Sequence, residues 1–209
     1  MRSYLITPNP TRDYLRDFPQ ILFAFKPNLA MFRVDSYNLE NLDSEIFALA
    51  LDFAKLCKQN GVLSFLNLPN IAQIFQNTQM QEKLFAHFDG VHLKGAQRDL
   101  LPILRDLPKN FSLGFSAHSI AEVESALALG AQYCTLSPIF STPNKGAPLG
   151  IETLLSLDSA LLSRIFALGG IDTPQKRAEL ESALKANFDN TCNLRGFASI
   201  RYFLNPQNI

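Results

Sequence analysis

The chain has 209 residues, of which 47% are hydrophobic, and its 19 basic and 19 acidic side chains give a formal net charge of zero. The length suits one α/β barrel, so we expect residues 1–209 to form a single domain. The neutral charge balance gives no support for a nucleic-acid partner. No apolar run approaches the roughly 20 residues that span a bilayer, so we expect no membrane partner either.

The cysteines and the first residues bear on location. Cys57, Cys134 and Cys192 are far apart and odd in number, which indicates neither a disulfide framework nor a zinc site. The polar, proline-containing start at Met1–Pro10 is not typical of a signal peptide. We therefore expect reduced, structural cysteines and a cytoplasmic protein.

Short apolar runs alternate with helical patterns along the whole chain, and eight of these runs are expected to be strands. They are Tyr4–Thr7, Ala30–Val34, Val62–Leu66, Gly90–Leu93, Phe111–Ser116, Tyr133–Leu136, Arg164–Leu168 and Arg195–Ile200. No helix is assigned between the first two strands. After the eighth strand only a short tail follows, so we expect a stunted last helix.

Helices are expected between most of the strands, from apolar periodicity and from start and stop residues. They are Glu45–Gln59, an irregular helix over Ile71–Phe88, Gln97–Leu107 with Pro102 in its first turn, a helix opened by Ser119 and closed by Gly130, Ile151–Leu162, and a helix that starts at Thr173-Pro174.

Eight strands that alternate with helices predict a TIM (β/α)₈ barrel. The alternative is an open doubly wound sheet, which the eight regular units and the missing glycine-rich turn after the first strand disfavour. The sequence has no G-x-G-x-x-G and no P-loop pattern, so dinucleotide and nucleotide binding have no support.

A rim of polar side chains is expected at the carboxyl ends of the strands, which all point the same way in a barrel. Ser116 and His118 follow the fifth strand, and the loop after the sixth carries Thr142, Asn144 and Lys145. Together they offer hydroxyls, an ammonium and an imidazole to a small anion. His118 either moves a proton near neutral pH or only caps and packs. Lys145 is either an anion clamp or a solvated loop lysine.

The loops after the last two strands are candidates for a phosphate site. Gly169 and Gly170 let backbone N–H groups approach a phosphate, and Ala198 and Ser199 would complete the site from the eighth strand. The alternative is that the two glycines simply make a tight turn.

The second, third and fourth strands supply further candidates. Arg33 either binds a phosphate or carboxylate or pairs internally with Asp35. Asn67 is either a hydrogen-bond donor to a ligand or a turn residue. Asp99 lies past the fourth strand and is a candidate magnesium ligand, although magnesium needs several oxygen ligands and this is a single carboxylate.

Several motifs are similar to those of the thiamin phosphate synthase family and its TenI-like relatives. They are G-V-H-L at Gly90, S-A-H-S at Ser116, S-P-I-F-S-T-P-N-K at Ser137, P-L-G at Pro148, A-L-G-G-I at Ala167 and G-F-A-S-I at Gly196. The resemblance runs from Tyr4 to Ile200, and it implies a TIM barrel that acts in thiamin biosynthesis.

The resemblance also implies residue roles. Synthases join a pyrimidine pyrophosphate to a thiazole phosphate with Mg²⁺, and the positions of Ser116, Thr142 and Lys145 would grip the pyrophosphate. The positions of Gly169, Gly170, Ala198 and Ser199 would hold the thiazole phosphate. Some TenI-like proteins are thiazole tautomerases, for which the implied acid and base is the residue at His118.

The chain departs from the synthase pattern where a diphosphate and its metal would bind. Asp35 replaces a lysine, Leu68 replaces an aspartate that holds magnesium, and Asn144 replaces a threonine. Asp99 follows a longer loop than usual. Losing charge-assisted contacts worth about 1.5–3 kcal/mol each weakens a magnesium diphosphate site.

The sequence therefore predicts a TenI-like tautomerase without a cofactor, acting on a small phosphorylated thiazole. The alternatives are a synthase that uses Mg²⁺, and a non-catalytic regulatory protein that binds a thiazole or thiamin phosphate. The 17 phenylalanines leave room for an apolar interface between copies of the chain, so formation of a homo-oligomer stays open.

Overall fold

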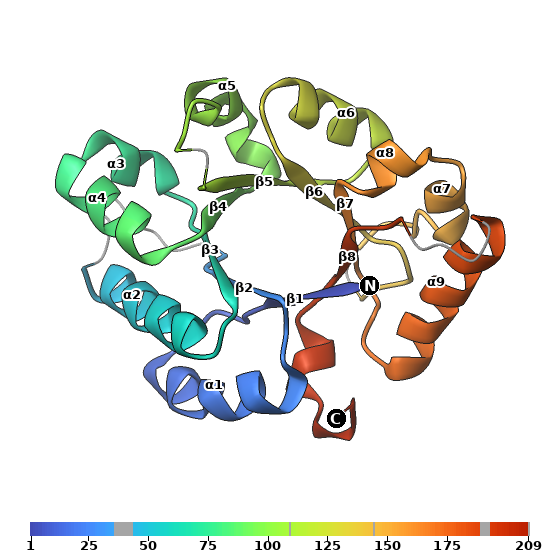
Figure 1. Cartoon of the computed structure of the whole chain (residues 1–209), viewed down its shortest axis with the longest axis horizontal. Coiled ribbons are helices and arrows are strands. Elements are labelled where there is room, and N and C mark those ends of the chain that lie inside the picture. Colours follow the sequence, from blue (N-terminus) through green and yellow to red (C-terminus); the bar gives the residue numbers. More distant parts are fainter. Residues whose placement is uncertain (36–43, 109, 144, 189–192, 209) are drawn as a thin grey trace.

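Eight parallel strands close into a barrel in the computed structural model, which describes residues 1–35, 44–108, 110–143, 145–188 and 193–208. The strands are β1 (Arg2–Ile6), β2 (Leu29–Arg33), β3 (Leu63–Asn67), β4 (Gly90–Leu93), β5 (Ser112–Ala117), β6 (Tyr133–Leu136), β7 (Ile165–Leu168) and β8 (Gly196–Ser199). Each strand pairs with its neighbour in chain order, and β8 pairs with β1 (Figure 1). The predicted TIM barrel is confirmed and the open sheet is ruled out.

Helices surround the barrel on its outer side (Figure 1). The α-helices are α1 (Arg12–Phe25), α2 (Ser44–Gln59), α3 (Ile71–Gln76), α4 (Thr78–His87), α5 (Leu101–Leu104), α6 (Ile120–Ala128), α7 (Ile151–Leu155), α8 (Ser159–Leu162) and α9 (Pro174–Asn187). The 3₁₀ helices are η1 (Gly95–Leu100), η2 (Arg201–Leu204) and η3 (Pro206–Asn208). The last two replace a full final helix, in agreement with the expected stunted end.

Helix α1 occupies the segment to which the sequence assigned no helix. Thr11 caps it, because its hydroxyl oxygen accepts a hydrogen bond from the Tyr14 N–H at 3.2 Å. Leu15, Phe18 and Leu22 form its buried face. Pro19 lies inside the helix, where proline normally argues against helical structure, so this residue hid the pattern.

Two of the expected helices are each split in two by a side chain that caps the second half. The Asn77 side chain accepts a hydrogen bond from the Met80 N–H at 3.1 Å and so starts α4. Asp158 accepts from the Leu161 N–H at 2.7 Å and so starts α8. The expected helix over residues 97–107 is instead η1 followed by the single turn of α5, and Pro102 lies in that turn as predicted.

The barrel interior is filled by aromatic rings toward the amino ends of the strands. Tyr4, Phe65, Tyr133 and Phe166 pack edge to face, with ring centroids 5.2–6.1 Å apart. A second apolar core lies between the strands and the helices. The interior rings fill the barrel with side chains, as in other barrels of this type.

The two cysteines that the structure describes are buried and free. Burial raises the pKa of the Cys134 thiol to about 12 and raises that of Cys57 as well, which keeps both in the thiol form. Cys192 lies outside the described residues. Within the described chain, no helix is both long enough and apolar enough to cross a membrane.

Candidate functional site

A cavity of about 460 Å³ opens at the carboxyl ends of the strands. Its walls include most of the residues predicted to form the site. These are Arg33, Asn67, Ser116, His118, Thr142, Lys145, Gly169, Gly170 and Ser199. The topology of the barrel thus brings residues from six strands and their loops to one place, as the rim argument predicted.

Two predicted site residues lie elsewhere. Ala198 is fully buried in the interior cluster with Tyr4 and Phe166 and is not part of the cavity wall. Asp99 is exposed on η1 and does not line the cavity either. Asn144 lies outside the described residues.

The glycine turn after β7 lines the cavity and has a backbone conformation that favours glycine. Gly169 and Gly170 have φ angles of 95° and 69°, which favour glycine. A Cβ on Gly170 would lie 2.6 Å from the Cβ of Phe140, because the loop after β6 packs directly on the turn. The N–H of Gly170 has no acceptor among the described residues. The turn is therefore tight and also presents a free donor at the cavity.

The loop after β8 faces this turn across the end of the barrel. The Ser199 hydroxyl oxygen accepts a hydrogen bond from the Tyr202 N–H at 3.1 Å, which stabilises the start of η2. Arg201 follows it and lines the cavity as an exposed cation. These groups make this wall of the cavity attractive to an anion.

The end of β2 carries an ion pair between Arg33 and Asp35. This is the alternative that the sequence left open for Arg33, although the arginine still lines the cavity. Lys94 donates from its ammonium to the carbonyl oxygens of Val34 and Asp35, the latter at 2.7 Å. Burial lowers the pKa of Lys94, and the charge of Asp35 opposes that shift.

Asn67 is buried, and its side-chain nitrogen donates to the His92 carbonyl oxygen. This hydrogen bond uses one of the two amide hydrogens, so the second N–H and the side-chain oxygen remain for a ligand. The next residue, Leu68, is only 1% exposed and packs in the outer core, where the related synthases are expected to carry a metal-binding aspartate.

The His118 imidazole is held in one tautomer. Its Nδ1 lies 2.9 Å from the Ser137 carbonyl oxygen, and a carbonyl only accepts, so Nδ1 carries the hydrogen. In the neutral ring the lone pair is therefore on Nε2. The side chain is exposed at the cavity wall, and no described residue bonds to Nε2. This leaves a basic nitrogen available to a ligand.

The backbone around His118 is fixed by a variant of the capping box at the start of α6. The Ser119 hydroxyl oxygen accepts from the Glu122 N–H at 3.2 Å, as expected. The Glu122 carboxylate accepts from the His118 N–H at 2.7 Å rather than from Ser119. The start of α6 therefore positions the imidazole.

Cavity residues to which the sequence assigned no site role include His92, Lys94 and Arg201. In a strand every second side chain faces the same way, so His92 implies Lys94 as its neighbour on the inner face. Arg201 carried no such signal, because it lies in a turn beyond β8.

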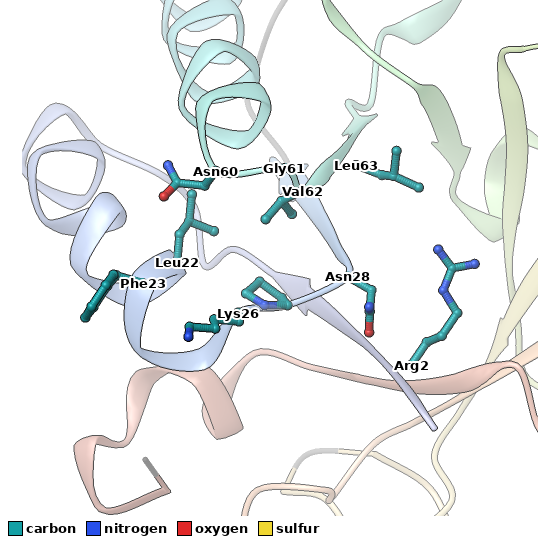
Figure 2. A pocket seen from close by; sticks show the side chains of 10 residues that line it. Arg2, Leu22, Phe23, Lys26, Asn28, Asn60, Gly61, Val62 and Leu63 are labelled. Atoms are coloured by element: carbon teal, nitrogen blue, oxygen red, sulfur yellow. The ribbon is translucent and has the colours of Figure 1, made fainter.

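A second cavity of about 450 Å³ lies at the opposite end of the barrel, where the strands begin (Figure 2). Its polar groups include the cations Arg2 and Lys26 and the amide of Asn28, whose oxygen accepts from the Ser3 N–H. The residues that line it include no histidine, cysteine or carboxylate. The chemistry-bearing side chains are thus concentrated at the carboxyl end, where TIM barrels place their sites.

The fold and the cavity define a (β/α)₈-barrel protein whose cavity at the carboxyl ends of the strands is lined by several cationic side chains. The family model described as thiamine monophosphate synthase matches residues 3–196. The chain belongs to this family of thiamin biosynthesis, and the resemblance predicted from the sequence is confirmed.

Relatives with assigned names support this placement. A protein of Aquifex aeolicus, provisionally named thiamine-phosphate synthase 2, is 30% identical over 175 residues, which are 81% of this chain and 85% of the relative. The thiamine-phosphate synthase of Chloroflexus aurantiacus is 35% identical over 127 residues, or 59% of this chain and 53% of the relative. The chain thus matches only about half the length of the Chloroflexus protein.

A solved structure shows the same fold. The thiamine phosphate pyrophosphorylase from Pyrococcus furiosus superposes with a TM-score of 0.63 at 18% identity, over 95% of this chain and 85% of that protein.

Proposed function

We propose that this protein is a TenI-like thiazole tautomerase, which shifts a proton on a carboxythiazole phosphate to make the ring aromatic. The observation that carries the proposal is the free Nε2 of His118, which has its tautomer fixed by Ser137 and lies at the cavity wall. Across the cavity, the turn at Gly169 and Gly170 suits one phosphate group.

The proposed reaction needs one group that both takes and returns a proton. His118 Nε2 accepts the proton of the ring carbon that bears the carboxylate, and the C–H electron pair spreads into the conjugated ring. The imidazolium then returns the proton to the exocyclic carbon, which completes the aromatic ring and leaves His118 neutral. Arg33 or Lys145 meets the carboxylate.

The donor set of the cavity favours this reaction over one that needs Mg²⁺ and a diphosphate. The carboxylates in the described cavity wall are Asp35 and Asp172, and each is in an ion pair, with Arg33 and with Lys176 respectively. They follow β2 and β7 and do not form a cluster. Magnesium needs several oxygen ligands, so these residues do not fit a magnesium diphosphate site.

The names of the relatives favour a second candidate, a thiamine-phosphate synthase with altered ligands. This reaction releases pyrophosphate and depends on Mg²⁺. A third reading, in which the protein only binds a thiazole or thiamin phosphate, predicts ligand-induced stabilisation without turnover.

The test follows isomerisation of the carboxythiazole phosphate in deuterium oxide by proton NMR. Wild-type protein is expected to convert the substrate with chelator present, and His118→Gln is expected to lose activity by about 10²–10⁴-fold, the usual contribution of a general base. His87→Gln is the matched control, because His87 lies at the end of α4 outside the cavity.

Two results would contradict the proposal. One is isomerisation by His118→Gln at the wild-type rate. The other is magnesium-dependent pyrophosphate release from pyrimidine pyrophosphate and thiazole phosphate with no isomerisation, which would establish the synthase instead.

A further inference from the structure

A chain of four hydrogen-bonded side chains runs from the cavity wall into the barrel interior. Ser116 Oγ lies 3.0 Å from His92 Nε2, and His92 Nδ1 lies 3.3 Å from the Tyr133 hydroxyl. The Tyr133 hydroxyl lies 3.0 Å from that of Tyr4. Ser116 reaches the cavity, while the two tyrosines are fully buried.

The barrel interior is built to hold this chain. Gly114 on β5 leaves the space that the chain needs, because a Cβ there would lie 2.6 Å from His92 Nδ1 and closer still to the Tyr133 ring. Burial lowers the pKa of His92 to about 3, so its ring is neutral and has one N–H. Burial raises the pKa values of Tyr4 and Tyr133, so both keep their hydroxyl hydrogens.

Counting donors and acceptors fixes the direction of the hydrogen bonds. Among the described residues, Tyr4 has a single hydrogen-bond partner for its hydroxyl, the Tyr133 oxygen. If Tyr4 donates, Tyr133 donates to His92 Nδ1, and His92 Nε2–H donates to Ser116. Every buried hydrogen then has an acceptor.

The reverse direction leaves one hydrogen unsatisfied. Ser116 would donate to His92 Nε2, His92 Nδ1–H to Tyr133, and Tyr133 to Tyr4. The Tyr4 hydrogen would then be buried without an acceptor, which is unfavourable. Arg195, whose guanidinium lies 5.4 Å from the centre of the Tyr133 ring, offers no remedy, because a guanidinium only donates.

We propose that this chain fixes Ser116 as a hydrogen-bond donor to an anionic oxygen of the ligand, with His92 and Tyr133 as the residues that position it. The Ser116 oxygen accepts from His92, so its own hydrogen is left for the cavity. The identity of the anion rests on the proposed function: it is the carboxylate of the thiazole, which gains negative charge when His118 removes the neighbouring proton.

This arrangement gives the site a preference for ligand groups that accept a hydrogen bond, which a lone serine lacks. A free hydroxyl rotates and serves donors and acceptors alike. Here the hydroxyl oxygen is engaged by His92, and successive hydrogen bonds polarise one another. A carboxylate accepts the Ser116 hydrogen through either of its oxygens and carries a full negative charge, whereas a carboxamide accepts it only through its one neutral carbonyl oxygen.

The first experiment reads the direction of the chain itself. The protein has three histidines, so ¹⁵N-histidine labelling gives few ring signals to assign by NMR. We expect His92 with its hydrogen on Nε2 and neutral His118 with its hydrogen on Nδ1. Tyr4→Phe is expected to keep the Nε2–H form of His92, because Tyr133 still has His92 as its acceptor. His92 with its hydrogen on Nδ1 in the wild type would overturn the proposal.

The second experiment measures ligand preference as a ratio, which a merely structural effect would not move. Binding of a thiazole carboxylate and of the matching carboxamide is compared by calorimetry. Ser116→Ala is expected to lower the carboxylate preference about tenfold, and Tyr133→Phe several-fold. Tyr202→Phe serves as the matched control, because it removes a tyrosine hydroxyl that is not part of the hydrogen-bonded series from Ser116 to Tyr4. An unchanged ratio in Ser116→Ala would overturn the proposal.

The two experiments separate this inference from the proposed function. If the protein fails to isomerise the carboxythiazole phosphate but shows the expected tautomer and ratio, the donor role of Ser116 stands and the tautomerase assignment falls. If isomerisation is seen while the ratio is unaffected by Ser116→Ala, the donor role falls and the tautomerase assignment stands.

Discussion

Two histidines at the same cavity are held in opposite ways. His118 is exposed and donates from Nδ1 to the Ser137 carbonyl, which leaves Nε2 free. His92 is 1% exposed, and both of its nitrogens are engaged by hydroxyls. The first arrangement suits proton transfer and the second suits positioning, so the environment rather than the residue type sets the role.

The burial of His92 predicts a stability that depends on pH. Its pKa is lowered from 6.5 to about 3 in the folded protein, so between these values the unfolded chain binds the extra proton. The free energy of unfolding is therefore expected to fall as the pH falls from about 6.5 toward 3, by up to about 1.4 kcal/mol per pH unit. Above pH 6.5 His92 is neutral in both the folded and the unfolded protein, so none of this stability is lost.

Urea unfolding at a series of pH values checks this expectation. His92→Gln is expected to flatten the loss of stability below pH 6.5, and His87→Gln is the control because His87 is only half-buried. The same slope in His92→Gln as in the wild type would contradict the prediction.

The glycine turn after β7 gives a second prediction at the residue scale. Gly170→Ala is expected to cost about 1–3 kcal/mol of stability, because φ is positive and the new Cβ meets Phe140 and the Ser141 carbonyl. Binding of thiazole phosphate is expected to weaken as well, because the donor N–H is displaced. Thermal unfolding and calorimetry measure the two effects.

Gly146→Ala is the matched control for this change. Gly146 has open space where a Cβ would go, so the substitution is expected to alter stability by less than about 0.5 kcal/mol. Equal effects at the two glycines would show that the tight packing at Gly170 does not matter.

At the scale of the elements, helix α1 is the clearest case in which local signals and the fold disagree. Its residues from Arg12 to Phe25 contain Pro19, yet tertiary packing of Phe18 on Phe53, with ring centroids 4.9 Å apart, holds the helix on the barrel. Local propensity is a weak guide where burial of a helix face decides the structure.

The cap of α1 is accessible to a direct test. Thr11→Ala is expected to destabilise the protein by about 1 kcal/mol, because the Tyr14 N–H loses its acceptor. For a chain of this size the melting temperature would fall by about 2–4 °C. Thr11→Ser keeps the oxygen and is expected to stay near the wild-type value. A loss of the same size in both variants would show that the hydroxyl is not what matters.

Much of the strand order and rim could be predicted from the sequence, because short apolar runs and the polar residues at their ends place strands and side chains without knowledge of contacts. The strand boundaries agree with the structure to within two residues, as at Tyr4–Thr7 for β1. The ion pair of Arg33 and the orientation of Asn67 depend on partners from other strands, so they could only be left open.

At the scale of the whole molecule, a neutral chain concentrates cations at one cavity. The described wall holds four cationic side chains and two carboxylates, so it carries an excess of positive charge. The cations are Arg33, Lys94, Lys145 and Arg201, and the carboxylates are Asp35 and Asp172. The closed barrel fixes these groups on rigid strand ends and leaves no sheet edge. Binding of a phosphorylated ligand should therefore stabilise the entire fold.

Ligand-induced stabilisation gives the last prediction. Thiazole phosphate at about 100 times its dissociation constant is expected to add about 2.7 kcal/mol and to raise the melting temperature by about 5–10 °C. The unphosphorylated thiazole alcohol at the same concentration is expected to give a much smaller rise. Equal shifts with both compounds would contradict a phosphate site at the cavity.

The fit between Gly114 and Tyr133 constrains how this barrel interior could evolve. A methyl group on Gly114 collides with the end of the Tyr133 ring as well as with its hydroxyl, so Tyr133→Phe does not make room for it. The same methyl group would lie 2.6 Å from His92 Nδ1, so both partners of the Tyr133–His92 hydrogen bond obstruct it. A larger residue at position 114 therefore requires that Tyr133 and His92 both move or change.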